Sequence, residues 1–195
     1  MLLTPRSIAA NVEGAPPSAV VEKPKHQKND AVGKKKVFFS SPILLEQADA
    51  RSFKEGEEIT LMAWGNAFVT KIVRGVDGDV TELELKLHLE GDFKKTEKKV
   101  TWLARNQTLV NVELVDFDYL ITKDKLEEDD DVKDFINKNT EFKESAVADC
   151  NVADVKEDDI LQFERKGYYR CDKPAVGGKP AIFFCIPTGK EKGGK

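Results

Sequence analysis

Apolar and polar residues alternate with a period of two over much of the chain, and this pattern predicts a protein built mainly of β-strands. The clearest run is TELELKLHLE at 81–90, in which four leucines share one face and charged residues share the other. Such alternation is typical of an antiparallel sheet with one buried and one solvated face. His88 falls on the polar face of this run, so it is interpreted as a solvated strand residue.

Further strand signals follow along the chain, separated by turns. They lie at 37–39, 59–73, 100–104, 110–121, 160–164, 168–171 and 181–186. The segment 42–46 fits a strand or a helix, and short helices are expected at 132–136 and 145–155. The Asp77-Gly78 pair predicts a hairpin turn. Together these elements predict a mainly β fold of two small antiparallel β-barrels with short helices.

The two barrels are expected to be joined through an acidic run at 127–131. Residues 1–36, interrupted by four prolines, are expected to form a partly extended lead-in that contributes to the first barrel, with one short strand near 18–22. The lead-in lysines suit either a solvated linker or an arm that contacts phosphates; they are Lys23, Lys25, Lys28 and Lys34 to Lys36. The first barrel is expected over 37–120 and the second over 121–188, with exchange of strands between the barrels left open. The tail 189–195 is expected to be disordered.

Composition excludes several classes of protein. Charged residues make up 34% of the 195 residues, and 31 basic against 35 acidic side chains give a net charge of −4. No stretch approaches the roughly 20 apolar residues that a membrane-spanning helix needs. The mild acidity excludes a generally basic nucleic-acid binder but not a local basic groove. The first residues lack a signal-peptide pattern, so a reducing, cytoplasmic environment is expected.

Residues suited to catalysis or metal binding are scarce. The cysteines, Cys150, Cys171 and Cys185, show no CxxC spacing, and the two histidines lie far apart, so no disulfide framework and no metal site is predicted. Phosphate-binding glycine loops and the GxSxG nucleophile motif do not occur. Carboxylate pairs stay open, because 35 acidic residues offer many. No catalytic residue is assigned, and a binding module is favoured over an enzyme.

Basic and aromatic residues are interleaved in LQFERKGYYR at 161–170. Gln162 and Arg165 stand close to a turn at Lys166-Gly167, and Tyr168 and Tyr169 follow it directly. Arginine and glutamine can read base edges, and tyrosine can stack on an unpaired base. A β-hairpin with solvated basic residues and core tyrosines fits the composition equally well. The segment 62–68 is similarly ambiguous, since its Trp64 suits a core position or a stacking surface.

Several segments in consistent order carry a resemblance to a known family. They are LMAWGNAFV at 61–69, HLEGDFKKT at 88–96, KVTWLA at 99–104 and QFERKGYY at 162–169, with DYLITK at 118–123 and IPTG at 186–189 in support. The chain resembles the C-terminal anticodon-binding region of eukaryotic cytosolic glutamyl-tRNA synthetases over roughly 22–190. The resemblance implies two β-barrels that bind the anticodon stem and loop of tRNA(Glu), in support of glutamyl-tRNA formation.

The resemblance also implies roles for particular residues. Gln162 and Arg165 are expected to face anticodon bases, and Arg6, in the pair Pro5-Arg6, is a further candidate. Tyr168 and Tyr169 are expected to stack on bases. The tRNA backbone would be met by Lys94, Lys95, Lys98, Lys99, Lys166 and Arg170. Gly65 replaces an arginine of the glutaminyl enzymes, which favours the glutamate assignment.

Only the C-terminal part of such an enzyme is represented, because the two nucleotide-binding motifs of class I synthetases do not occur. An excised domain, an incomplete gene model and a natural fragment all remain open. No cofactor is expected in this chain; the resemblance implies that ATP and Mg²⁺ act in a catalytic domain that this chain lacks, and the chain alone is expected to be inactive. The expected partners are tRNA(Glu) and also other synthetases or an assembly cofactor, but neither a membrane nor DNA. The alternative function is a protein-interaction module that docks a synthetase into a multi-synthetase assembly through its acidic run.

Overall fold

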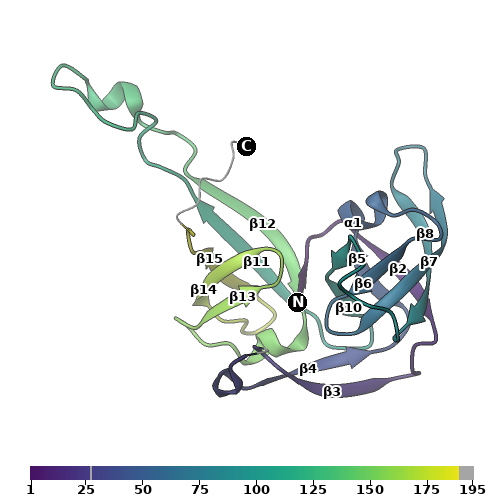
Figure 1. Ribbon diagram of the computed structural model, residues 1–195. Coiled ribbons are helices and arrows are strands. Elements are labelled where there is room, and N and C mark those ends of the chain that lie inside the picture. The colour runs from purple at the N-terminus through teal and green to yellow at the C-terminus, as the bar shows by residue number, and fades with distance from the viewer. Residues whose placement is uncertain (27, 189–195) are drawn as a thin grey trace.

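The strands form two large sheets and one separate two-stranded ribbon (Figure 1). The computed structural model describes residues 1–26 and 28–188, so the tail predicted to be disordered lies outside the described residues. One sheet curls into a nearly closed barrel and the other forms a half-barrel. The prediction of a mainly β fold with two barrel-like units and short helices is confirmed.

The first sheet has seven strands in the order β10-β5-β2-β8-β7-β6-β9. Their bounds are Ser7–Glu13 for β2, Ile43–Glu46 for β5, Glu58–Leu61 for β6, Gly65–Arg74 for β7, Val80–His88 for β8, Lys99–Val100 for β9 and Trp102–Ala104 for β10. Because β9 and β10 are consecutive in sequence but stand at opposite ends of the order, the sheet nearly closes on itself. Of the segment 42–46, for which strand and helix were both open, residues 43–46 form the strand β5. The helix α1 (Gln47–Ser52) follows it directly.

Aromatic rings fill one end of the first barrel. Trp102 is 1% exposed, and its indole N–H donates to the carbonyl of Met62 at 2.9 Å. The ring of Trp64 lies 4.7 Å from that of Trp102 and 5.0 Å from that of Phe39. Trp64 is therefore a half-buried part of the core. The alternation predicted for 81–90 is present in β8, where Leu83 and Leu85 are buried.

The second sheet has six strands in the order β1-β12-β11-β15-β14-β13. Their bounds are Leu2–Leu3 for β1, Val110–Phe117 for β11, Glu141–Ala148 for β12, Ile160–Phe163 for β13, Gly167–Lys173 for β14 and Ala181–Cys185 for β15. The strand β11, expected in the first barrel, thus belongs to the second unit. It pairs with β12 over eight residues, and this pairing decides its place. The same pairing makes 141–148 a strand, so only the 3₁₀ helix η3 (Cys150–Asp154) matches the helix expected at 145–155.

The first 36 residues hold more regular structure than the one short strand expected near 18–22. The strand β2 lies inside the first sheet between β5 and β8, where Ala10 is fully buried and Val12 is 5% exposed. Tertiary pairing overrides the effect of the prolines, because they fall outside β2 and, in β3, only at the last position. Residues 2–3 form β1 at the edge of the second sheet, so the two units share the N-terminal segment.

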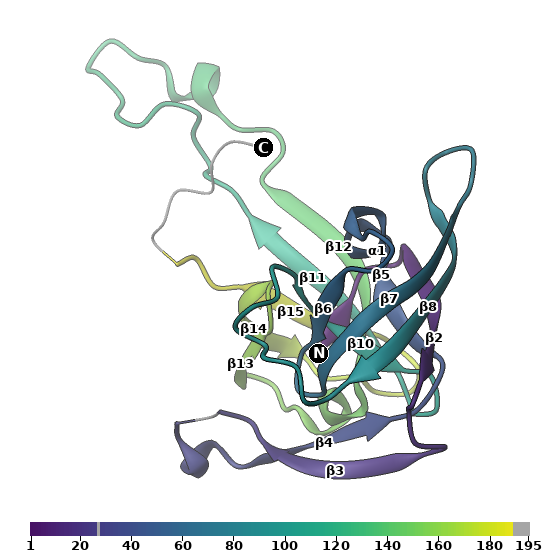
Figure 2. The same ribbon diagram turned by 45° about the vertical axis from the view of Figure 1, so that its right-hand side comes forward.

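The two-stranded ribbon consists of β3 (Ala19–Pro24) and β4 (Lys34–Phe39), joined by a connection that contains the 3₁₀ helix η1 (Asp30–Val32). It runs below both units in Figure 1 and stays below them in the turned view of Figure 2. Residues 18–22, expected as one short strand, fall largely within β3. The lead-in lysines thus belong to an ordered ribbon.

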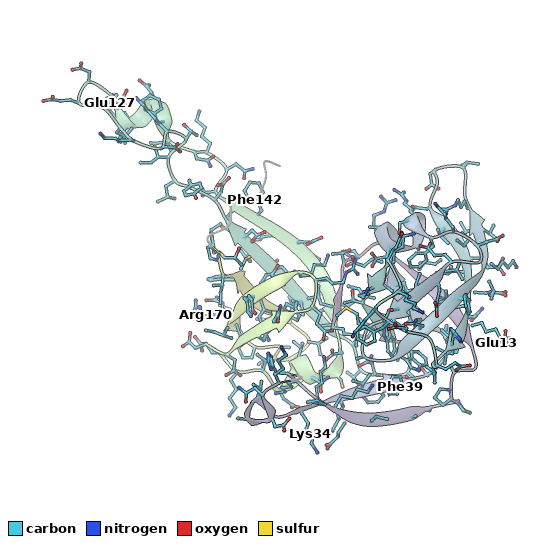
Figure 3. All side chains as sticks on the ribbon, in the orientation of Figure 1. Glu13, Lys34, Phe39, Glu127, Phe142 and Arg170 are labelled. Atoms are coloured by element: carbon cyan, nitrogen blue, oxygen red, sulfur yellow. The ribbon has the colours of Figure 1, made fainter. Side chains whose placement is uncertain are left out.

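Residues 118–140 form a long hairpin between β11 and β12 that projects away from the rest of the protein (Figure 1). It holds the acidic run and the 3₁₀ helix η2 (Val132–Phe135), close to the helix predicted at 132–136. Glu127 lies near its far end (Figure 3).

The longest helix in the described part of the chain has six residues, too few to span a bilayer.

Candidate nucleic-acid interface

The predicted RNA-reading segment forms a tight hairpin between β13 and β14. The backbone N–H of Lys166 donates to the carbonyl of Phe163 at 2.9 Å, and Arg165 adopts a positive φ of 68°. A non-glycine residue with this backbone conformation is uncommon and needs support from its surroundings. That support comes from the first barrel, which Arg165 and Lys166 contact, and from the ribbon, which Glu164 contacts. We call residues 164–166 the charged turn.

Arg165 is bound by α1. Its two terminal nitrogens donate to the two carboxylate oxygens of Asp49, each at 2.6 Å, and one of them also lies 3.3 Å from the hydroxyl of Thr101. The hydrogen bonds to Asp49 raise the pKa of Arg165. This two-pronged geometry is the strongest pairing between arginine and a carboxylate. Since a guanidinium has five N–H donors, some of them stay open to a ligand.

The neighbours of Arg165 form two further contacts with the same side of the molecule. Lys166 lies 3.1 Å from Glu46, and Glu164 accepts from Lys35 at 3.1 Å. Burial acts to raise the pKa of Glu46, but a hydrogen bond from the Thr4 backbone N–H and the charge of Lys166 outweigh it, so the pKa is lowered. Each residue of the charged turn therefore meets a side chain of opposite charge: Glu164 meets Lys35, Arg165 meets Asp49, and Lys166 meets Glu46.

The other two predicted base readers lie in different settings. Gln162 is exposed on the edge strand β13, directly opposite Tyr168, and its side chain has no hydrogen-bond partner among the described residues. Arg6 donates to Asp79 at 2.6 Å, and Asp79 also accepts from Arg51 at 2.7 Å. Arg165 contacts α1 directly through Asp49, whereas Arg6 is linked to α1 only through Asp79, which also binds Arg51.

The two predicted stacking residues differ in exposure. Tyr168 is 48% exposed, whereas Tyr169 is 6% exposed and packs against Phe163 with ring centroids 5.4 Å apart. Successive residues of a strand point to opposite faces of the sheet, so only one of two adjacent tyrosines can face solvent. Tyr169 is a core residue, and the prediction that it stacks on a base is corrected.

The predicted phosphate-binding residues fall into two groups. Lys94 and Lys95 are exposed and have no ion pair in the described part of the chain. The other four already bind protein groups: Lys98 contacts Glu57 at 2.7 Å, Lys99 donates to the carbonyl of Thr96, Lys166 contacts Glu46, and Arg170 pairs with Asp158 and lies over the ring of Phe184. Lys94 and Lys95 are the cations best placed to meet a new anion.

His88 is more closely held than its position on a polar face suggests. Its Nδ1 lies 2.7 Å from Glu58, which also accepts from the side chain of Asn66 at 3.0 Å. The ring stacks on Phe68 at 5.0 Å. The hydrogen bonds from His88 and Asn66 lower the pKa of Glu58. The interpretation of His88 as simply solvated is corrected, and its contacts give it a structural role.

The acidic partners of the charged turn and of Arg6 were not found by sequence reasoning. Glu46, Asp49 and Asp79 stand among 35 acidic residues, and Asp49 is 116 positions from Arg165. The only available signal was the proximity of Glu46 and Asp49 to each other in the sequence.

No arrangement of three or more metal-ligating side chains occurs among residues 1–26 and 28–188.

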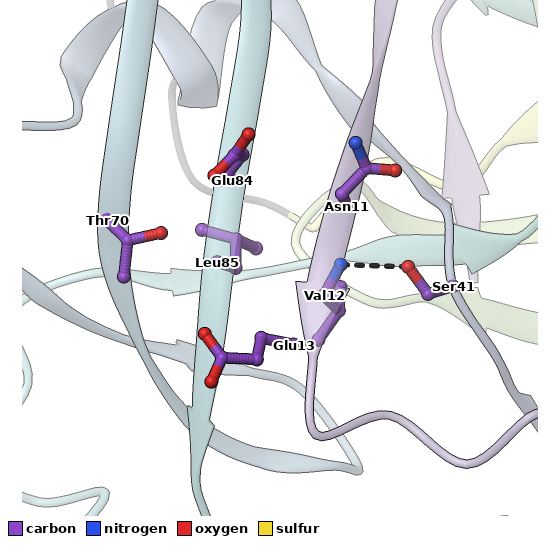
Figure 4. Close-up of a pocket in the computed structure, with 7 residues that line it drawn as sticks. All are labelled: Asn11, Val12, Glu13, Ser41, Thr70, Glu84 and Leu85. Carbon is purple, nitrogen blue, oxygen red and sulfur yellow. Dashed lines mark hydrogen bonds between the residues drawn. The ribbon is translucent and has the colours of Figure 1, made fainter.

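A shallow pocket lies elsewhere on the first barrel. Its lining comes from β2, β7, β8 and the loop before β5: Asn11, Val12, Glu13, Ser41, Thr70, Glu84 and Leu85 (Figure 4). The hydroxyl of Ser41 accepts from the backbone N–H of Val12 at 2.9 Å. Glu13 and Glu84 give the pocket an acidic rim, which disfavours a phosphate. None of the predicted binding residues reaches this pocket.

Comparison with known proteins decides the family. A family profile described as "tRNA synthetases class I (E and Q), anti-codon binding domain" matches residues 3–88, and a second profile with the same description matches residues 99–172. The chain belongs to this anticodon-binding family. The gap between the two matches, residues 89–98, lies within the first barrel, because β9 and β10 still belong to the first sheet. The resemblance noted in the sequence is confirmed.

Curated relatives of this anticodon-binding chain are glutamate–tRNA ligases. The probable cytoplasmic glutamate–tRNA ligase of Schizosaccharomyces pombe is 53% identical over 184 residues, which cover 94% of this chain and 26% of that protein. The cytoplasmic enzyme of Saccharomyces cerevisiae is 50% identical over 97% of the chain and 26% of its own length. The bifunctional glutamate/proline–tRNA ligase of Mus musculus is 39% identical over 86% of the chain. The chain thus spans about a quarter of the two yeast proteins.

Proposed function

We propose that this chain recognises the anticodon stem and loop of tRNA(Glu), and that it supports formation of glutamyl-tRNA in the cytoplasm as the binding region of a glutamate–tRNA ligase. The main support is that two anticodon-binding profiles match residues 3–88 and 99–172. The two matched regions contact each other through the charged turn. Relatives named as cytoplasmic glutamate–tRNA ligases support the choice of glutamate and of compartment. The alternative of a pure protein-interaction module is less favoured, because both matches are to RNA-binding domains.

Base reading in this proposal belongs to Gln162, Arg165 and Arg6. An exposed amide can donate to and accept from a base edge, and a guanidinium offers a planar pair of donors. Arg165 is held by Asp49 through two of its donors, so the ion pair fixes the direction of those that remain. Tyr168, on the same face as Gln162, supplies a stacking surface for an unpaired base.

Backbone contacts in this proposal belong first to Lys94 and Lys95, which are exposed and unpaired within the described residues. Lys98, Lys99, Lys166 and Arg170 contribute positive potential while they hold protein groups. Such contacts raise affinity without reading sequence. Other synthetases or an assembly cofactor are proposed as additional partners, in line with relatives that carry a second ligase activity in the same protein.

Filter binding of the chain to transcribed tRNA(Glu), at two salt concentrations, tests the proposal. We expect saturable binding that weakens steeply with salt, and weaker binding to the same tRNA with an altered anticodon. Equal affinity for both RNAs, or no binding at all, would contradict anticodon recognition.

We also propose that the chain needs no cofactor of its own and that ATP and Mg²⁺ act elsewhere in the parent enzyme. Glutamyl-tRNA formation by the purified chain would overturn that assignment.

A further inference from the structure

The β3–β4 ribbon is strongly basic. Residues 19–39 contain six lysines against two acidic residues, a net charge of +4, so the remainder of the chain carries −8. The projecting hairpin, in contrast, has eight carboxylates and four lysines over 118–140. The ribbon lies at the opposite end of the molecule from this hairpin (Figure 1). An approaching polyanion is therefore directed toward the ribbon.

The ribbon is firmly attached through one of its faces. Phe39 and Val37 are only 7% and 5% exposed, because they pack into the core of the first barrel. The ring of Phe39 lies 5.0 Å from that of Trp64. The ammonium of Lys23 binds the carbonyl of Ala63. A two-stranded ribbon is only marginally stable by itself in water, so these contacts keep it ordered.

A second attachment joins the ribbon to the other unit. Lys35 reaches Glu164 in the charged turn at 3.1 Å. The side chain of Asn151 accepts from the backbone N–H of Lys36 at 2.8 Å and donates to its carbonyl at 2.9 Å. The ribbon thus contacts both units, and Lys35 joins it to the hairpin that carries Gln162 and Arg165.

The remaining lysines of the ribbon point outward or lie in its connection. Residues paired across the two strands share a face, which places Lys34 and Lys36 with Glu22 on the face opposite Phe39. Lys25, Lys28 and Lys36 are exposed and have no ion pair among the described residues, and Lys34 has only a distant one, 3.8 Å from Glu22. Figure 3 shows Lys34 at the outer side of the ribbon and Phe39 where it meets the first barrel.

We propose that the ribbon is a separate RNA-backbone contact, in which Lys25, Lys28 and Lys36 bind phosphates of the strand whose bases lie at the charged turn. This inference rests on the proposed anticodon recognition. Lysine is a compact, hydrated charge on a flexible stem, which suits phosphate oxygens and reads no sequence. The ribbon therefore supplies affinity, while Gln162 and Arg165 supply discrimination.

The test compares two triple variants with the same change in net charge. The ribbon variant is Lys25→Gln, Lys28→Gln and Lys36→Gln; the control variant is Lys125→Gln, Lys133→Gln and Lys138→Gln, on the acidic hairpin. Affinity of the full chain for tRNA(Glu) and for its anticodon-altered form is measured across a series of salt concentrations. Matching thermal unfolding curves establish that both variants keep the fold of the parent.

We expect the ribbon variant to bind both RNAs about tenfold more weakly at low salt, with the slope of log affinity against log salt reduced by about 2. The control variant is expected to match the parent. Parental affinity and slope in the ribbon variant would overturn the ribbon proposal alone. Loss confined to the cognate anticodon would also overturn it, since the contact would then read bases. Absence of any binding by the parent would instead remove the proposed function, and the ribbon proposal with it.

Lysine acetylation gives a readout that needs no variant. The chain is modified with a limiting acetylating reagent, alone and with saturating tRNA(Glu), and each site is quantified by mass spectrometry. We expect protection of Lys25, Lys28 and Lys36 and none of Lys125, Lys133 and Lys138. Unchanged modification of the three ribbon lysines in a complex that protects Lys94 and Lys95 would place the RNA elsewhere and reject the ribbon contact.

Discussion

Arg165 pairs with a carboxylate of its own chain, and the proposed function gives it a second partner, a base of the RNA. Its bidentate contact with Asp49 holds the guanidinium in one orientation, which lowers the entropy lost when an RNA edge binds. The residue is 36% exposed at its side chain, so an RNA can reach it without breaking the pair. In the proposed function, the side chain that attaches the two units also contacts the RNA.

Substitution of Arg165 separates these roles. We expect Arg165→Ala to weaken tRNA(Glu) binding by about 1–3 kcal/mol, with a smaller loss on the anticodon-altered RNA. Arg165→Lys is the matched control, because it keeps the charge but loses the planar fork. It should restore salt-dependent affinity without restoring discrimination. Competition binding with both RNAs gives the measurement, and an equal loss on both RNAs would show that Arg165 reads no base.

Gly91 is fixed by steric fit to the network around His88. A Cβ atom at this position would lie 2.3 Å from Glu58, 2.7 Å from Asn66 and 2.8 Å from His88. We expect Gly91→Ala to lower the free energy of unfolding by about 1–3 kcal/mol, because the polar network must shift. Gly75→Ala is the control, since the closest atom to its Cβ would be in the flexible side chain of Asp77 at 3.0 Å, with Thr81 and the Asp79 carbonyl at the ordinary contact distances of 3.5 and 3.7 Å. Urea unfolding compares the two; equal effects would mean that the network tolerates the displacement.

At the scale of elements, the ribbon depends on which of two adjacent phenylalanines faces the core. Phe39 is 7% exposed among tryptophans, whereas Phe38 shares the opposite face with Val20. We expect Phe39→Ala to cost about 3–5 kcal/mol of stability and to expose the ribbon to protease near 25–33. Phe38→Ala, the neighbouring control, should cost less and leave the ribbon protected. Comparable cleavage of both variants would contradict attachment through the inner face.

The sequence allowed most strands to be predicted, since period-two alternation depends only on the local contrast between a buried and a wet face. It failed where pairing across the fold decides. Residues 7–13 carry no strong alternation, yet they form β2 because β5 and β8 flank them. Residues 141–148 are rich in small and charged side chains, but eight pairs with β11 make them a strand. Neither pairing can be seen in a local window.

The candidate site was predictable only in part for the same reason. Gln162 and Tyr168 lie on an exposed strand face, which the predicted hairpin turn and the pleat of the strands determine locally. Tyr169 could be assigned to the core only after the register of β13 and β14 was known. The partners of Arg165 and Lys166 required the relative position of two units that sequence does not provide.

At the scale of the whole molecule, three consecutive residues connect the two units by charge. Lys35, Asp49 and Glu46 on the first side meet Glu164, Arg165 and Lys166 on the second. These contacts are partly buried, so salt screens them less than exposed pairs. Because Gln162 belongs to the same hairpin, the orientation of the two units also determines where the side chains proposed to read bases lie. Loss of the charged turn should therefore affect RNA discrimination together with stability.

Acid should weaken this connection through Glu46. Its pKa is lowered in the folded protein, so its stabilising contribution is present above the unfolded value near 4.5 and is lost as the pH falls through the lower folded pKa. We expect Glu46→Gln to lower the free energy of unfolding at pH 7 by about 1–2 kcal/mol, with the difference from the parent shrinking below pH 4.5. Glu127→Gln, an equal charge change on the exposed hairpin, serves as the control. Urea unfolding at a series of pH values gives both curves. A difference between parent and Glu46→Gln that stayed constant down to low pH would mean that the carboxylate charge contributes nothing, and that the side chain of Glu46 stabilises the contact by its shape alone.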